Sequence, residues 1–177
     1  MRSWIVDCGL WIASVIAAAI LSGGLLHAET IDRVLAVAGG QIITLSDVTA
    51  ARDFGLVTPA TGSDPIRTAL TLLIDRELVL VEVDRYAPPE PSKESVDREF
   101  AAVRARFPDQ AAFDAACARS GIDGARVREA VRQNLRIRAY QDQRFAAADP
   151  RRQTLIDEWL AGLRRRGDIV DLYLSGR

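Results

Sequence analysis

The chain contains few side chains that could serve as a nucleophile, a general base or a metal ligand. Its single histidine, His27, lies near the amino terminus, and Cys117 is the only cysteine beyond residue 8. Ser-His-Asp and Cys-His mechanisms use histidine as the base, and zinc sites are mostly built from histidine and cysteine. The carboxylates of Glu94, Asp97 and Glu99 are spaced like a solvated helix face rather than an acid–base pair. We therefore expect no catalytic residues, no cofactor and no metal site, and predict that the chain is not an enzyme.

Apolar binding is the chemistry that remains, and the aromatic side chains are its best candidates. Several lie near predicted helix ends or in loops, where a ring can line a groove that accepts apolar side chains. Phe54, in a predicted loop, is the first choice for an exposed position of this kind. Packing in the core is the alternative for each aromatic ring. The candidate binding residues are Phe54, Leu56, Tyr86, Phe107 and Phe113.

A second candidate feature is a run of arginines between residues 126 and 144. A basic rim there would attract anionic segments or an anionic membrane surface, and Arg132 and Arg136 are the residues that we assign to it. A solvated polar helix face is the alternative. The formal net charge of −1 provides no overall field for binding nucleic acid.

The amino-terminal residues predict export. Arg2 precedes an apolar run over residues 10–26, and the small residue Ala28 follows. These are the features of a secretory signal peptide, residues 1–28, with cleavage most simply placed after Ala28. Retention of the segment as a membrane anchor is the alternative. The mature chain, 29–177, would keep only Cys117, so no internal disulfide can form, and we expect this cysteine to be a buried structural thiol.

Hydrophobic periodicity and turn residues predict the secondary structure. A hairpin is expected from an apolar strand at 34–37, a Gly39–Gly40 turn and a return strand with Ile42 and Ile43. Helix starts and stops follow from capping residues, prolines and Gly121. The predicted helices run from about 47 to 53, from 64 or 65 to the prolines at 88, from 92 to 107, from 109 to 121, from 123 to 145 and from 149 to 167, and Ile169–Leu174 forms a final strand. The expected fold is one mostly α-helical domain with a small antiparallel sheet, built from the amino-terminal hairpin and the carboxyl-terminal strand.

Three segments carry a resemblance to a known family. RVLAVAGGQIITLSDV resembles the opening strand, turn, strand and helix start of the N-terminal domain of SurA-type periplasmic chaperones. A second segment is similar to the long helix, the proline break and the next helix of that domain: LTLLIDRELVLVEVDRYAPPEPSKESVDREF. A third segment is similar to the two helices that follow: FDAACARSGIDGARVREAVRQNLRIRAYQDQRF. In the family, parvulin isomerase domains come next, and the chain then returns as a helix and strand. Here Phe145 is followed almost at once by such a helix and strand, which implies a main part at 29–145 completed by 150–177, without the isomerase domains.

The resemblance implies a function and a location. It implies an ATP-independent periplasmic holdase that binds unfolded exported polypeptides, such as outer-membrane β-barrel precursors, without prolyl isomerase activity. The alternative is a non-catalytic interaction subunit that docks a single partner in the cell envelope. Neither function involves nucleic acid, and contact with the membrane would be made only through the signal peptide before cleavage.

Overall fold

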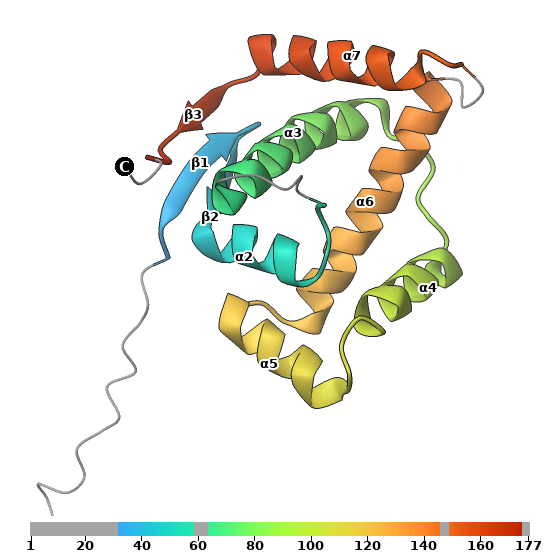
Figure 1. Cartoon of the computed structure of the whole chain (residues 1–177). Helices are drawn as coiled ribbons and strands as arrows, with labels where there is room; N and C mark the ends of the chain where they lie inside the picture. The colour runs from blue at the N-terminus through green and yellow to red at the C-terminus, as the bar shows by residue number, and fades with distance from the viewer. Residues whose placement is uncertain (1–31, 59–63, 146–148, 175–177) are drawn as a thin grey trace, which may run out of the picture. The chain divides into compact units, whose positions relative to one another are not determined.

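The computed structural model describes residues 32–58, 64–145 and 149–174. The predicted signal peptide, 1–28, lies outside these residues. The elements in chain order are β1 (Val34–Ala38), β2 (Gln41–Thr44), α2 (Leu45–Asp53), α3 (Pro65–Tyr86), α4 (Lys93–Arg104), α5 (Gln110–Ser120), α6 (Gly124–Arg144), α7 (Arg152–Arg166) and β3 (Ile169–Asp171) (Figure 1). The fold is mostly α-helical with a small three-stranded antiparallel sheet, and the predicted fold class is confirmed.

Strands β1 and β2 form the predicted hairpin. Its two turn residues, Gly39 and Gly40, have φ angles of 58° and 79°, in the left-handed region that glycine adopts without a steric penalty. Strand β3 pairs with the other side of β1, so the strand order is β2-β1-β3. The observed strand ends at Asp171 rather than Leu174. The reason is local, because the Asp171 carboxylate accepts a hydrogen bond from the Tyr173 N–H (3.0 Å) and bends the chain there.

A bulge in β1 sets the two faces of the sheet. The register with β2 shifts between Val34 and Ala36, so Leu35 is an additional residue in β1. As a result, the consecutive residues Leu35 and Ala36 are both buried. Val37 lies opposite Ile42 on one side and Val170 on the other. Cross-strand partners point to the same face, so these three valine and isoleucine side chains form an apolar row on the outer face.

Side-chain caps begin most helices where the sequence predicts them. Thr44 and Asp47 form a capping box at α2: the Thr44 Oγ1 accepts from the Asp47 N–H (3.2 Å), and the Asp47 carboxylate accepts from the Thr44 N–H (2.9 Å). This cap starts the helix at Leu45, two residues before the predicted start. Asp64 caps α3, and Pro65 occupies its first position. Residues Ser92, Asp109 and Asp123 cap α4, α5 and α6 in the same way.

Helix α7 is the exception. Its N-cap residue, Arg151, makes no side-chain capping bond. The segment Asp149–Arg151 forms a turn instead, in which the Arg152 N–H donates to the Asp149 carbonyl oxygen (2.9 Å). The helix therefore begins later than the predicted start at Asp149 and Pro150.

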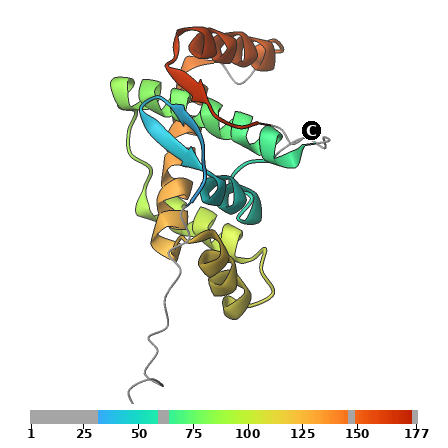
Figure 2. The ribbon, with the colours of Figure 1, turned by 90° about the vertical axis from the view of Figure 1, so that its left-hand side faces the viewer.

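Helix α3 lies at the centre of the first of two hydrophobic cores. The sheet packs on it through β1, and α6 and α7 also contact it (Figures 1 and 2). Figure 2 shows β3 lying beside β1, in agreement with their pairing. The largest members of this sheet core are Leu35, Val48, Leu70, Leu73, Ile74, Leu78, Val79, Val83, Tyr140 and Leu163.

Polar contacts tie the carboxyl-terminal segment to α3. The Asp75 carboxylate is buried and accepts two hydrogen bonds of 2.5 Å from the Arg164 guanidinium of α7. These bonds raise the pKa of Arg164, so its guanidinium remains charged. Near β3, Arg67 pairs with Asp171 and donates to the Tyr173 carbonyl oxygen (2.6 Å).

The second core, which we call the aromatic core, lies among α2, α4, α5 and α6. Phe54 is fully buried there, with its ring centroid 5.5 Å from that of Phe113 and 5.6 Å from that of Phe107. The Phe54–Phe113 pair is edge-to-face, an arrangement that is favourable for aromatic rings, and the Phe54–Phe107 pair is tilted. Cys117 is buried in the same core, as predicted, and its burial raises the pKa of the thiol.

Candidate binding groove

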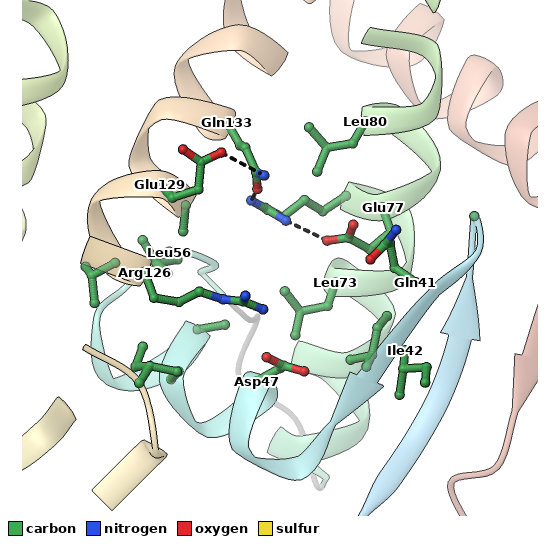
Figure 3. A pocket seen from close by; sticks show the side chains of 18 of the residues that line it. Gln41, Ile42, Asp47, Leu56, Leu73, Glu77, Leu80, Arg126, Glu129 and Gln133 are labelled. Atoms are coloured by element: carbon green, nitrogen blue, oxygen red, sulfur yellow. Dashed lines mark hydrogen bonds and ion pairs between the residues drawn. The ribbon is translucent and has the colours of Figure 1, made fainter. Parts of the chain in front are cut away.

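A groove with a cavity volume of about 380 Å³ lies between α3 and α6. Helix α2 forms its base, and the β1–β2 turn and strand β2 border one side (Figure 3). The capping box at Thr44 positions this base, because it turns the chain from β2 directly into α2. Residues far apart in the sequence therefore line one open space.

The groove has an apolar floor. Its buried apolar members come from β2, α2, α3 and α6, and Leu56 and Ile122 add partly buried side chains. Figure 3 shows Leu56, Leu73 and Leu80 on its walls. The buried members are Ile43, Ala50, Ala51, Leu73, Leu80 and Val127. A floor of this composition can accept apolar side chains without reading a strict sequence.

A hydrogen-bonded network forms the upper rim and joins α3 to α6. Arg76 of α3 donates to Asn134 (3.1 Å), Gln133 (2.5 Å) and Glu77 (2.5 Å). Gln133 in turn donates to Glu129 (3.1 Å). Because Arg76 bonds to both walls, it holds the two helices at a fixed separation and keeps the groove open.

The two arginines of the predicted basic rim, Arg132 and Arg136, are paired with carboxylates, and Arg136 lines the groove. Arg132 pairs with Glu129 (2.7 Å) and Glu90 (2.5 Å), while Arg136 pairs with Asp84 (2.8 Å) and Glu90 (3.1 Å). Hydrogen bonds from Arg132 lower the pKa of Glu129, which therefore stays ionised. Carboxylates from the end of α3 and from the proline segment thus neutralise both arginines.

Arg126 is the arginine that remains available to a ligand. Figure 3 shows its side chain extending from the first turn of α6 into the groove. Within residues 32–58, 64–145 and 149–174, no carboxylate forms an ion pair with it. Asp47 also lines the groove, but its carboxylate is occupied by the cap at Thr44. Arg126 belongs to the arginine run between residues 126 and 144, and nothing in its sequence position distinguishes it from its paired neighbours.

Two exposed apolar side chains border the groove, and neither is among the binding residues predicted from the sequence. Ile42 of β2 is 62% exposed, and Val81 of α3 is 48% exposed. The hairpin turn packs closely against Val81, since a Cβ added at Gly39 would lie 2.8 Å from the Val81 Cγ2. The signal for an exposed residue in β2 is the pair Ile42 and Ile43, because neighbouring residues of a regular strand point to opposite faces.

The five predicted binding residues do not form one site. Leu56 lines the groove, whereas Tyr86 is exposed outside it and stacks on Tyr140. Phe107 is partly buried against the rings of the aromatic core. The expectation that Phe54 is exposed is wrong, and the same holds for the buried Phe113, because the two rings pack against each other.

The described residues offer no metal-binding cluster of three or more His, Cys, Asp or Glu side chains. In the same part of the chain, no helix is long and apolar enough to cross a membrane. The groove therefore combines an apolar floor, the guanidinium of Arg126, which has no ion pair within the described residues, and a bordering strand, β2. This arrangement can bind an extended polypeptide through its side chains and main chain.

No protein-family model matches this chain, and no curated protein is significantly similar to it.

Proposed function

We propose that the chain is a SurA-type N-terminal chaperone domain that holds unfolded exported polypeptides in the periplasm without catalysis, nucleotide or isomerase activity. The observation that carries the proposal is the open groove between α3 and α6, with its apolar floor and its exposed border residues, Ile42 and Val81. The order of elements, from the hairpin through the helices to a returning helix and strand, also supports it.

The composition of the groove suits transient holding. Burial of apolar side chains is non-directional, so it does not require one client sequence. Because ordering an unfolded segment costs conformational entropy, the net affinity stays modest and the client can leave without an energy source. The half-exposed border residues become covered when a client binds, and this buries additional apolar area. The floor, in contrast, is already formed in the free protein.

The first test is suppression of aggregation. We expect the mature protein to prevent aggregation of a diluted, urea-unfolded β-barrel precursor at near-stoichiometric ratios, without nucleotide. Protection should persist in moderately raised salt, because apolar burial is not screened as exposed charge pairs are. Light scattering at low and high salt measures this. Protection that disappears in salt would indicate an electrostatic tether, and no protection, with one folded envelope protein co-purifying instead, would favour the interaction subunit.

A matched pair of variants tests the position of the site. Val81 and Val170 are both 48% exposed, but only Val81 borders the groove. We expect Val81→Ser to weaken binding of a fluorescent precursor peptide about threefold, since part of one valine side chain would no longer be buried. Val170→Ser should leave the affinity unchanged. Equal effects of the two substitutions, measured by fluorescence anisotropy, would place the binding surface elsewhere.

A third test concerns Arg126. We expect Arg126→Gln to weaken binding of a peptide with an acidic residue by about two- to fivefold, and to leave the amide version of that peptide unaffected. Arg138→Gln is the control, because Arg138 is an exposed arginine of the same helix outside the groove. An equal loss with both variants would show a general effect of charge rather than a contact in the groove.

A further inference from the structure

Within residues 32–58, 64–145 and 149–174, strand β2 has main-chain groups without a hydrogen-bond partner. Val37 forms the hydrogen-bonded pair with Val170, as the flanking bonds from Gly39 N–H to Asp168 O (3.3 Å) and from Leu172 N–H to Leu35 O (2.9 Å) show. The main-chain groups of Val37 therefore point toward β3. In an antiparallel ladder this makes Val37 and Ile42 a non-hydrogen-bonded pair, so the N–H and C=O of Ile42 point away from β1.

These groups lie at an open edge of the sheet. Strand β2 is at one end of the order β2-β1-β3, and in the described part of the chain no backbone group outside the sheet bonds to Ile42. The residues of β2 are uncharged, whereas the opposite edge, on β3, carries Asp171 in an ion pair with Arg67. Charged residues protect an edge from pairing with another chain. Only the β3 edge has this protection.

The open edge and the groove adjoin each other. The lining of the groove includes Gln41, Ile42 and Ile43 of β2 but no residue of β1 or β3 (Figure 3). A chain that paired with β2 would therefore lie along the groove. Thr44 limits the length of this pairing, because its N–H is already bonded to Asp47.

We propose that the polypeptide bound in the groove adds to β2 as a fourth, extended strand, with its main chain hydrogen-bonded to the N–H and C=O of Ile42. This inference rests on the proposed function and specifies how the same site holds its client. Main-chain pairing gives affinity that does not depend on sequence, as a holdase requires. The short pairing keeps that affinity low and permits release.

The structure also indicates which kind of client segment would pair best with β2. On the outer face, the client residue opposite Ile42 would extend the apolar row of Val170, Val37 and Ile42, which favours a valine, isoleucine or aromatic side chain there. Side chains in a strand alternate between faces, so the neighbouring client residues point toward the groove. There the apolar floor and Arg126 together favour side chains such as threonine or glutamate, whose methyl or methylene groups can pack on the floor while the polar end faces the guanidinium. The preferred client therefore alternates apolar with polar residues, as a half-buried β-strand does.

Amide exchange provides a direct test. The Ile42 N–H should exchange rapidly in the free protein and at least about tenfold more slowly when a peptide of alternating valine and threonine or glutamate is bound. The Val37 N–H, already paired with Val170, is the internal control and should not change. An Ile42 N–H that exchanges equally fast with and without saturating peptide would overturn strand addition.

Two substitutions separate the main chain of Ile42 from its side chain. Both Ile42→Thr and Ile42→Pro lose the isoleucine side chain, but only Ile42→Pro loses the N–H, which the hairpin does not use. We expect Ile42→Pro to bind the alternating peptide about tenfold more weakly than Ile42→Thr does. Equal affinities in two folded variants would contradict the proposal. If Ile42→Pro fails to fold, the amide-exchange measurement on the wild-type protein decides whether the client adds to β2 as a strand.

A second peptide distinguishes this proposal from the proposed function. It has the same composition, but its apolar residues are grouped in one block, which removes the alternation. We expect it to bind several-fold more weakly. If both peptides bind equally well and neither protects Ile42, the groove binds clients without strand addition. If neither peptide binds at all, the proposed function and the strand addition both fail.

Discussion

Deletion of residues 149–177 is expected to unfold the domain or to lower its Tm by about 15 °C or more. The deletion removes Leu163, which is buried in the sheet core, and Trp159 and Leu160, which pack against it, and full burial of such a side chain contributes about 1.5–3 kcal/mol. It also leaves Asp75 buried without Arg164, and it removes β3 from the edge of β1. A domain with a total stability of about 5–15 kcal/mol cannot easily tolerate this combined loss.

Circular dichroism during thermal and urea unfolding measures this effect, and point variants of α7 calibrate it. Leu163→Ala removes one buried side chain and should cost about 2–5 kcal/mol. Glu158→Ala changes an exposed residue of the same helix and should have almost no effect. A truncated protein with the midpoint and cooperativity of the complete mature chain would show that α7 and β3 are not part of the folding unit.

Phe54→Ala is expected to reduce the free energy of unfolding by about 3–5 kcal/mol. The ring is fully buried, and its removal leaves a cavity beside Phe107 and Phe113. The groove should retain its affinity for a client at temperatures where the variant is folded, because Phe54 does not line it. Urea unfolding and peptide binding on the same samples measure the two effects separately.

Tyr86→Ala is the matched control for Phe54→Ala. Tyr86 is an aromatic residue that is 59% exposed, with one stacking contact to Tyr140. We expect it to cost about 1 kcal/mol or less. If Phe54→Ala instead unfolded like the wild-type protein but lost client binding, the exposed-ring hypothesis from the sequence would be right and the aromatic core would not form as described.

Substitutions in the two cores affect different elements around the groove. Substitutions in the aromatic core affect the support of α2, because Ala50 and Phe54 belong to it. Substitutions in the sheet core affect α3 and the strand that borders the groove. The residues most suitable for functional tests are therefore the exposed border positions, Ile42 and Val81, whose substitution removes little buried area.

The sequence by itself determined the elements of this protein and most of their limits. The Gly39–Gly40 turn, the caps at Asp64, Ser92 and Asp109, and the end of α5 at Gly121 all lie where local signals place them. Each signal acts within a few residues: glycine permits a positive φ, and a capping oxygen reaches the N–H three residues ahead. The fold class followed because a two-stranded hairpin needs a third strand, and Ile169–Leu174 was the available segment.

Only the tertiary structure decided what the side chains do. Phe54 is buried because α2 turns it against α5, more than fifty residues away in the chain, and Arg132 and Arg136 are neutralised by carboxylates of other elements. Packing of the sheet on α3 decided that Ile43, which pairs with the buried Ala36, faces the core while Ile42 faces solvent. Burial, charge pairing and an open sheet edge all depend on which distant segments meet. Local periodicity does not contain that information, so the groove and its free edge emerged only when α2, α3, α6 and β2 were placed together.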